Sequence, residues 1–482
     1  MSQLMRLWID GTWEDGHKQA PLLAPYGGEE LALVGYASPE QAARAVEAAD
    51  RAFREHCGMP AHRRSSILYQ AADLLERRAE EAARIVALEA AKPIRAARAE
   101  IARTVQTYLF AAEAARSLTG ETVPMDAAPR GEGRTASVRR EPVGVVSAIT
   151  PFNFPFNLVA HKVGPALAAG NAVVLKPAEQ TPISALFLAE LFEEAGLPSG
   201  LLNIVPGDGR ELGPTLASHP LVSFVSFTGS PEVGRQIRQL AGLRRTTLEL
   251  GSNSPLLIDR GFTEEELGRI ADETAAGAFA YNGQVCISVQ RVFVHEELAD
   301  RFAAMLAERA KALVAGDPLA EETDITPLIS AKAAERLKGW LDAALARGAE
   351  LLCGGSFEGS LMRPAVLRGV PEDAELSCEE AFGPVAAIAP FRRWEEAVAA
   401  ANRSRYGLQA GVFTKDVEHA LHAAAELQAG GVMINDVPTF RLDHMPYGGR
   451  KDSGSGREGV RYAAEEMTEA KLVSFRSGLY RS

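Results

Sequence analysis

Cysteine is scarce in this sequence, and its four copies are scattered. Cys57, Cys286, Cys353 and Cys378 stand far apart along 482 residues. No two of them share the short spacing of a zinc site, and so few cysteines make no disulfide framework. The pattern excludes a disulfide-rich secreted scaffold, indicates no metal site and is typical of a reducing cytoplasm.

Long apolar runs and an excess of basic residues are also missing. No stretch is long enough to span a bilayer, and residues 1–10 lack the apolar core of a signal peptide. Lys and Arg number 51 against 63 Asp and Glu, which gives a net charge of −12. This balance argues against nucleic acid or an anionic membrane as a partner. We therefore expect a cytoplasmic protein whose main partner is neither nucleic acid nor a membrane.

The composition that remains is that of a large globular protein. Hydrophobic residues make up 46% and charged residues 24% of a chain that is long for one core, so two or three domains are expected. Helical spacing of apolar residues predicts helices over residues 39–55, 63–91 and 94–118. Glycine and proline interrupt residues 119–141, which predicts a protruding hairpin.

Strand-like and helix-like segments alternate from residue 143 onward. Strands are predicted at 143–149, 172–175, 202–205, 222–227 and 246–250, with helices at 156–169, 183–195, 211–218 and 231–240 between them. This βαβ series predicts an α/β fold with a doubly wound parallel sheet, whose ligands bind at the carboxyl ends of the strands. A second alternating run, with strands near 291–294, 385–389, 409–413 and 432–434, predicts a second doubly wound α/β domain facing the first. The active site should then lie in the cleft between them.

Cys286 stands out because of the segment around it, Asn282-Gly283-Gln284-Val285-Cys286-Ile287-Ser288. The segment links a predicted helix to a predicted strand. A thiol at such a turn can meet backbone N–H groups or a helix N-terminus, which would lower its pKa toward the reactive thiolate. An isolated cysteine is more often a small buried core residue, and that alternative stands for Cys286 taken alone.

A phosphate site is indicated after the fourth strand of the first sheet, at Phe227-Thr228-Gly229-Ser230-Pro231. Ser230 is a suitable N-cap and Pro231 a suitable first helical residue, so free N–H groups would point at a pyrophosphate. A plain, well-capped helix is the alternative. No G-x-G-x-x-G follows the first strand, and Gly209 in Gly207-Asp208-Gly209 is only a weak substitute.

Five short segments accompany the cysteine in a fixed order. They are Pro151-Phe152-Asn153-Phe154-Pro155, Lys176-Pro177-Ala178-Glu179, Phe227-Thr228-Gly229-Ser230, Leu248-Glu249-Leu250-Gly251 and Glu380-Ala381-Phe382-Gly383-Pro384. Their order and spacing resemble the aldehyde dehydrogenase superfamily over nearly the whole chain. The resemblance implies a dinucleotide-binding domain of residues 1–118 and 142–251 and a catalytic domain of residues 252–450. Residues 119–141 and 465–482 would form a small β oligomerisation arm of a homodimer or homotetramer.

The resemblance also implies roles for individual residues. Cys286 would be the nucleophile, and the side-chain amide of Asn153 with the backbone N–H of Cys286 would stabilise the oxyanion. Glu249 would be the general base that activates water. Lys176, which we group with these catalytic residues, would bind the adenosine ribose. Without the resemblance, Asn153 would be an ordinary turn residue and Glu249 a surface carboxylate.

The implied cofactor is NAD, with NADP possible. Glu179 would accept hydrogen bonds from two ribose hydroxyls and repel a 2′-phosphate, while Glu380 would hold the nicotinamide ribose beside Phe382. The full set of expected cofactor-binding residues is Thr150, Pro151, Phe152, Asn153, Lys176, Glu179, Gly209, Phe227, Gly229, Ser230, Val233, Leu250, Gly251, Glu380 and Phe382.

These roles compose one reaction. Thiolate attack on an aldehyde gives a tetrahedral thiohemiacetal, which expels a hydride and leaves a thioester for Glu249 to hydrolyse to a carboxylic acid. Relatives that pass the thioester to coenzyme A lack this base. Two other classes stay open: a thiol hydrolase that uses the Cys286–Glu249 pair without nicotinamide, and a structural protein that needs neither residue.

The substrate is indicated by the residue before the nucleophile. Relatives that oxidise phosphorylated aldehydes carry arginine there, whereas this chain has Val285, which removes a bidentate anion donor. The tail, residues 448–468, resembles the lactaldehyde dehydrogenase-like branch. We therefore expect a small uncharged or hydroxylated aldehyde such as lactaldehyde, in a tunnel lined by Phe154 and Phe440. Arg103 and Arg441 keep an alternative open: an anionic aldehyde such as glyceraldehyde 3-phosphate, oxidised without phosphorylation.

Overall fold

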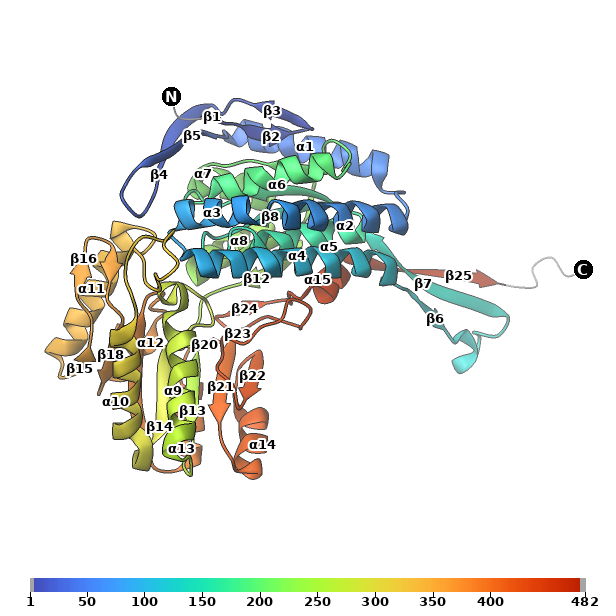
Figure 1. Cartoon of the computed structure of the whole chain (residues 1–482). Coiled ribbons are helices and arrows are strands. Elements are labelled where there is room, and N and C mark those ends of the chain that lie inside the picture. Colours follow the sequence, from blue (N-terminus) through green and yellow to red (C-terminus); the bar gives the residue numbers. More distant parts are fainter. Residues whose placement is uncertain (1–3, 477–482) are drawn as a thin grey trace, which may run out of the picture.

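A computed structural model describes residues 4–476 as two α/β units and a projecting arm (Figure 1). The fold class predicted from the sequence is confirmed. The first unit contains an eight-stranded sheet in the order β24-β12-β11-β8-β9-β10-β2-β3, and the second a seven-stranded sheet in the order β15-β18-β19-β14-β13-β21-β22. Each sheet supports one side of the candidate site.

The centre of the first sheet is parallel and buried on both faces. Its parallel strands are β8 (Val145–Ile149), β9 (Ala172–Lys176), β10 (Leu202–Ile204), β11 (Val222–Thr228) and β12 (Arg245–Glu249). Strands covered on both faces become continuous Val, Ile and Leu runs, which is the pattern that the sequence shows. Three antiparallel strands, β2 (Leu7–Ile9), β3 (Thr12–Glu14) and β24 (Gly454–Ser455), extend the two edges and were not predicted.

Helices cover both faces of this sheet. The crossover helices are α5 (Asn157–Ala169), α6 (Pro182–Glu194), α7 (Gly209–Ser218) and α8 (Pro231–Ala241), joined by α1 (Pro39–His56), α2 (Ala61–Arg77), α3 (Ala79–Ala90) and α4 (Ile94–Ser117). The single helix predicted over residues 63–91 is wrong, because the chain breaks between α2 and α3 at Arg78 (φ −102°, ψ 20°). The Arg78 guanidinium binds Glu81 nearby. It also binds Glu190 and stacks on Phe187, both of α6, and apolar periodicity cannot reveal contacts with so distant a segment.

The second sheet is parallel except for one edge strand. It comprises β13 (Pro255–Ile258), β14 (Arg291–His295), β15 (Glu350–Cys353), β18 (Ala365–Arg368), β19 (Val385–Phe391), β21 (Gln409–Phe413) and β22 (Gly431–Ile434), with β15 antiparallel. Its helices are α9 (Glu264–Phe279), α10 (Glu296–Ala312), α11 (Ala331–Ala346), α12 (Glu375–Cys378), α13 (Trp394–Asn402) and α14 (Val417–Glu426). Its core is separate from that of the first sheet, as expected for a second domain.

Short strands complete the two units. They are β1 (Leu4–Met5), β4 (Lys18–Leu23), β5 (Glu30–Tyr36), β16 (Phe357–Glu358), β17 (Leu361–Met362), β20 (Tyr406–Gly407) and β23 (Arg450–Lys451). After β23 the chain returns to the first unit through β24 and α15 (Val460–Glu466), which packs against α4 and α5. This return brings Glu458 beneath the site, and it includes residues 465–467, which we had assigned to the arm.

The arm is a three-stranded antiparallel sheet that projects from the body (Figure 1). It consists of β6 (Glu121–Val123), β7 (Arg134–Pro142) and β25 (Thr468–Arg476), with the 3-10 turn η1 (Met125–Ala127) at its end. Strand β25 pairs with β7 along its whole length, from Thr468 opposite Pro142 to Arg476 opposite Arg134. Residues 477–482 of the predicted arm lie outside the described residues.

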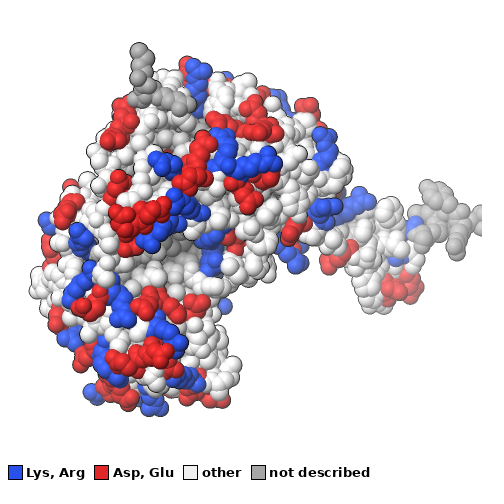
Figure 2. Space-filling model, viewed as in Figure 1, with Lys and Arg blue, Asp and Glu red and all other residues white. Residues whose placement is uncertain are grey.

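Charges of both signs alternate over the face drawn in Figure 2, without one large patch of a single sign. No helix within residues 4–476 has the length and apolar character that crossing a bilayer requires.

Candidate functional site

A cavity of about 330 Å³ opens onto Cys286 where the two units meet. Helix α4 and the loop before α5 form one wall, and α9, the cysteine loop and residues 437–447 form the other. The lining residues used below are Arg103, Phe154, Val285, Cys286, Arg441 and Tyr447. The cavity therefore gathers four of the five predicted substrate residues around the predicted nucleophile.

Phe440 is the exception, because it does not line this cavity, and its place in the tunnel lining stays a prediction. Its side chain is 42% exposed, while its neighbours Thr439 and Arg441 line the cavity. The carbonyl oxygen of Phe440 accepts a hydrogen bond from Gln409. This contact ties the backbone of Phe440 to β21 of the second unit.

The loop before Cys286 has an uncommon backbone. Tyr281 (φ 47°), Asn282 (φ 57°) and Gly283 (φ 67°) follow one another in the left-handed region. A Cβ on Gly283 would lie 2.2 Å from the carbonyl oxygen of Gly383, so only glycine fits there. Asn282 is buried and exchanges hydrogen bonds with Thr326, at 2.9 Å each way, which holds the loop in this conformation.

The thiol of Cys286 is neutral in this environment. Its Sγ lies 3.1 Å from the hydroxyl oxygen of Tyr447. Burial raises the pKa of Cys286 to about 11, although the Tyr447 hydroxyl and Arg441 lower it in part. We expected backbone N–H groups or a helix N-terminus to lower the pKa of Cys286. No helix N-terminus does so in the protein alone, because the residues after Cys286 lead through a loop into β14 and begin no helix.

The side chain of Asn153 crosses between the two units. Its Nδ2 donates to the carbonyl oxygen of Gln284, 2.9 Å away, two residues before Cys286. The amide nitrogen carries two hydrogens, so one donor remains for a second acceptor. The structure thus brings the predicted oxyanion donor to the nucleophile loop.

Glu249, at the end of β12, is fully buried. Neither of its carboxylate oxygens has a hydrogen-bond partner among the residues that the structure describes. Burial and, second, the charge of Glu458 raise the pKa of Glu249 well above its usual value. Burial therefore favours the neutral form of this carboxyl group, and no described residue hydrogen-bonds to it, as expected of a group that binds a water or a substrate.

A buried ionic group lies behind Glu249, and sequence reasoning missed two of its members. Glu458 accepts from Lys162 at 2.8 Å and from Arg441 at 3.1 Å, and the Arg441 guanidinium stacks 3.6 Å from the ring of Tyr447. Burial raises the pKa of Glu458, but Lys162 and Arg441 outweigh it and bring the value to about 2. Lys162 lies on α5 and Glu458 almost three hundred residues later, so no local pattern could have paired them.

A second ionic group holds Arg103. Its guanidinium binds both carboxylate oxygens of Asp443, at 2.7 and 3.2 Å. Asp443 also accepts from Asn157 at 3.0 Å and contacts His161 at 2.9 Å. Burial lowers the pKa of His161, so the imidazole is neutral and Asp443 balances the charge of Arg103.

The predicted phosphate site has the expected architecture. Ser230 caps α8 by accepting from the N–H of Val233, and Gly229 joins the cap to β11. A Cβ on Gly229 would come within 2.5 Å of the Phe227 ring, so glycine keeps the backbone close to this ring. Val233 is 43% exposed, and Leu250 packs against Gly234 of the same helix.

The predicted adenosine site lies at the ends of β9 and β10. Glu179 accepts from the backbone N–H of Gly209 at 2.8 Å and lies 3.6 Å from the Lys176 ammonium. Lys176 also donates to the carbonyl oxygen of Pro177. None of these partners lines the Cys286 cavity, so the contacts of Lys176 match its predicted cofactor role and not a place among the reacting groups.

The 380–384 loop brings the second unit against the first. Glu380 accepts from the backbone N–H of Ser252 at 3.0 Å, and burial raises its pKa to about 7. Phe382, with a left-handed φ of 46°, packs edge-on against Phe152, 5.8 Å between ring centres. A Cβ on Gly251 would lie 2.6 Å from Glu380. Pro151 and buried Thr150, whose N–H donates to the carbonyl oxygen of Lys176, complete this edge of the sheet.

These contacts fit a dinucleotide. Glu179 and Glu380 offer carboxylate oxygens near the ends of the parallel strands, and the capped helix α8 offers its N-terminus at the edge where ligands of parallel sheets bind.

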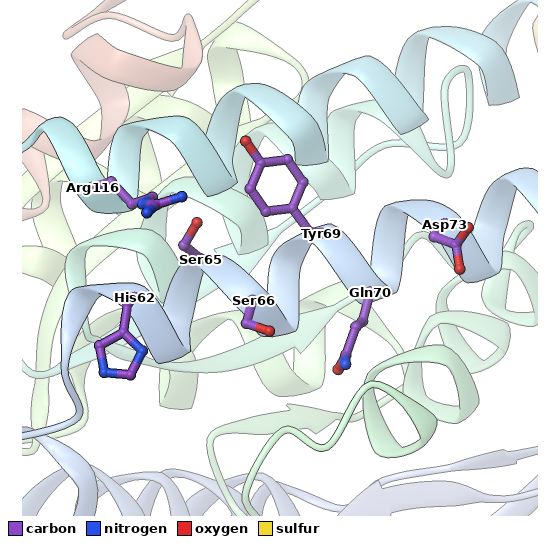
Figure 3. Close-up of a pocket in the computed structure, with 7 residues that line it drawn as sticks. All are labelled: His62, Ser65, Ser66, Tyr69, Gln70, Asp73 and Arg116. Carbon is purple, nitrogen blue, oxygen red and sulfur yellow. The ribbon is translucent and has the colours of Figure 1, made fainter.

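A second, more open groove of about 430 Å³ lies between α2 and α4 (Figure 3). It is lined by His62, Ser65, Ser66, Tyr69, Gln70, Asp73 and Arg116. None of these residues belongs to the site predicted from the sequence, so we assign the chemistry to the Cys286 cavity.

The raised pKa of Cys286 predicts how its reactivity depends on pH. Only the thiolate attacks iodoacetamide, so alkylation of Cys286 in the protein alone should accelerate about tenfold per pH unit between pH 7 and 10. Tyr447→Phe removes a group that lowers this pKa and should shift the profile to higher pH. Peptide mass spectrometry can follow Cys286, with exposed Cys57 in the same digest as the reference. An alkylation rate for Cys286 that stays constant from pH 7 to 9 would contradict the raised pKa of its thiol.

Comparisons with known proteins agree with this geometry. The model of the aldehyde dehydrogenase family matches residues 13–473. A 3-sulfolactaldehyde dehydrogenase of Priestia aryabhattai is 45% identical over 97% of both chains. A lactaldehyde dehydrogenase of Methanococcus vannielii is 39% identical over 97% of this chain and 99% of its own.

Solved structures share the whole fold. The NADP-dependent glyceraldehyde-3-phosphate dehydrogenase of Bacillus halodurans, complexed with NADP, superposes with a TM-score of 0.95 at 36% identity, over 98% of this chain and 99% of its own. The match to the family model spans both sheets, the cysteine loop and most of the arm. The chain therefore belongs to the aldehyde dehydrogenase family of NAD(P)-dependent oxidoreductases.

Proposed function

We propose that this enzyme oxidises a short 2-hydroxyaldehyde to its carboxylic acid and prefers one whose far end is anionic, such as a sulfonate or phosphate. The observation that carries the preference is the buried charge behind the cavity. Two cations, Lys162 and Arg441, bind the single carboxylate of Glu458, and Arg441 also lines the cavity. An anionic substrate would balance the surplus cation.

The related proteins are consistent with this substrate class. Sulfolactaldehyde, lactaldehyde and glyceraldehyde 3-phosphate, the compounds in the names of the three relatives, are all three-carbon 2-hydroxyaldehydes that differ at the third carbon. A neutral aldehyde such as lactaldehyde is the second candidate, because Val285 leaves the position before the nucleophile without an anion donor.

The residues around the cavity divide the reaction between them. The Cys286 thiolate bonds to the carbonyl carbon, and the resulting oxyanion accepts from the free amide hydrogen of Asn153 and the backbone N–H of Cys286. Glu179, Glu380 and the N-terminus of α8 would hold NAD or NADP, which would supply the acceptor for the hydride of the thiohemiacetal carbon. Glu249 then takes a proton from water, the hydroxide attacks the thioester carbon, and the Cys286 thiolate leaves.

Two substitutions separate these steps. Cys286→Ala should abolish cofactor reduction, whereas Glu249→Gln should reduce about one equivalent per site and then stall as the thioester. Stopped-flow absorbance of the reduced cofactor measures both. Cys378→Ala removes a thiol outside the Cys286 cavity and should behave as wild type. First-turnover rates that are equal in wild type and Cys286→Ala would refute the assignment of Cys286 as the nucleophile. Hydrolysis of an ester without any cofactor requirement would favour the thiol hydrolase.

Arg441→Met tests the preference for an anion. It removes the surplus cation and leaves the Lys162–Glu458 pair intact. We expect kcat/KM for an anionic 2-hydroxyaldehyde to fall about 100-fold, roughly 3 kcal/mol for a charge-assisted hydrogen bond. The value for lactaldehyde should fall less than tenfold. Arg103→Met is the companion variant: Arg103 also lines the cavity, but Asp443 binds its guanidinium through two hydrogen bonds, so we expect a smaller loss on the anionic substrate. Equal losses on both substrates would reject the anionic class.

NAD should be preferred over NADP, although a solved relative holds NADP. The proposal rests on Glu179, whose carboxylate lies beside Gly209 and would repel a 2′-phosphate. Glu179→Gln keeps an acceptor for the Gly209 N–H but removes the charge. We expect kcat/KM with NADP to rise about tenfold and that with NAD to fall slightly. A wild-type enzyme that is faster with NADP than with NAD would contradict the proposal.

The arm supports a homo-oligomer of two or four chains. Leu472 and Phe475 on β25 are 56% and 62% exposed, an unusual place for large apolar side chains unless another chain covers them. Leu472→Glu with Phe475→Glu should shift the particle mass toward the monomer in size-exclusion chromatography with light scattering. Val417→Glu, at an exposed apolar residue of α14, should leave the mass unchanged. An unaltered mass for the arm variant would refute this role. A cytoplasmic location stays a prediction from composition.

A further inference from the structure

A lysine with no role in the reaction described above is buried beside residues 153–157, the segment that carries the Asn153 amide. Lys92, 1% exposed, follows the end of α3. Its ammonium binds the carboxylate of Glu100 and donates to the carbonyl oxygen of Asn153 at 2.6 Å. It also lies 3.7 Å from the ring centre of Phe154 and 4.6 Å from that of Tyr281. Removing a charge from water to this extent is costly, and an apolar residue of the same size would avoid the cost.

Glu100 extends the grip on the same loop. One carboxylate oxygen binds Lys92, and the other accepts from the backbone N–H groups of Phe156 and Asn157, at 3.0 and 3.2 Å. These are the free donors at the start of α5. The Lys92–Glu100 pair therefore holds the backbone on both sides of residues 153–157, the segment that carries the Asn153 amide.

The turn that carries Lys92 also holds the nucleophile loop. The hydroxyl of Tyr281 donates to the carbonyl oxygen of Ala90 at 2.7 Å. The hydroxyl of Thr326 donates to the carbonyl oxygen of Ala91. Thr326 is the same residue that exchanges hydrogen bonds with Asn282. Ala91 itself is left-handed, with φ 47°, which turns the two carbonyl groups toward these donors.

We propose that Lys92, paired with Glu100, is a positioning residue that sets the Asn153 amide relative to Cys286 by tying both loops to the turn at residues 90–92. The proposal rests on the roles proposed above for Asn153 and Cys286. An oxyanion donor is effective only at hydrogen-bond distance from the reacting oxygen, and misplacement by about 1 Å costs about 100-fold in rate. Charged donors form shorter and stronger hydrogen bonds than neutral ones. The buried Lys92–Glu100 pair can therefore fix the backbone position of residues 153–157 more closely than neutral side chains could.

The test is the double variant Lys92→Met, Glu100→Gln. Methionine keeps the volume, and glutamine keeps an acceptor for the two N–H groups, so no unpaired charge is buried. We expect kcat to fall about 100-fold with KM within threefold. Alkylation of Cys286 by iodoacetamide needs no oxyanion donor and should stay within twofold of wild type. Glu89→Gln is the control: this buried carboxylate caps α6 through Ile183 and Ser184 in the same way but does not bind the site loops, so kcat should not change.

A thermodynamic cycle with Asn153→Ala distinguishes positioning from general stability. If Lys92 acts through Asn153, adding the double substitution to Asn153→Ala should cost no more than threefold beyond Asn153→Ala itself. Tyr281→Phe removes only the hydrogen bond to the carbonyl oxygen of Ala90 and should lower kcat about tenfold. This variant tests the proposal independently of the double variant. Additive losses, a kcat within threefold of wild type, or a change confined to KM would each overturn the proposal. Activity in Cys286→Ala would instead refute the proposed function.

Discussion

A hydrogen bond links the two units beside the proposed nucleophile. The side chain of Asn153, carried by the first sheet, donates to the carbonyl oxygen of Gln284 in the loop that carries Cys286. The donor and the nucleophile belong to units with separate cores, so their mutual placement depends on contacts across the junction. The Phe152–Phe382 contact, the Glu380–Ser252 bond and the turn at residues 90–92 all serve this placement.

Burial at the junction determines the charge state of each reactive group. Burial raises the pKa of both Cys286 and Glu249, while Glu458 stays ionised because Lys162 and Arg441 both contact it. Ionising Cys286 and Glu249 for the proposed reaction therefore costs free energy in the protein alone. The same low dielectric constant strengthens the attraction between Arg441 and a bound anion, and between the Asn153 amide and an oxyanion.

Much of the fold was predictable because local patterns report local structure. The alternation of apolar strands and helices identified the parallel core of both sheets, and the glycine and proline residues between 119 and 141 identified the arm. Predictions failed where a distant segment decided the outcome. The helix expected over residues 63–91 breaks at Arg78, whose partners Glu190 and Phe187 come from α6.

The sequence by itself determined the family, the reaction class and the candidate reactive residues, since these depend on short motifs whose order along the chain is visible. Only the tertiary structure decided the electrostatics: that the Cys286 thiol is neutral, that Glu249 has no hydrogen-bond partner among the described residues, and that Lys162 and Glu458 form a pair behind it. Charge states depend on burial and on partners hundreds of residues away, and those follow from how the sheets pack and not from neighbours along the chain.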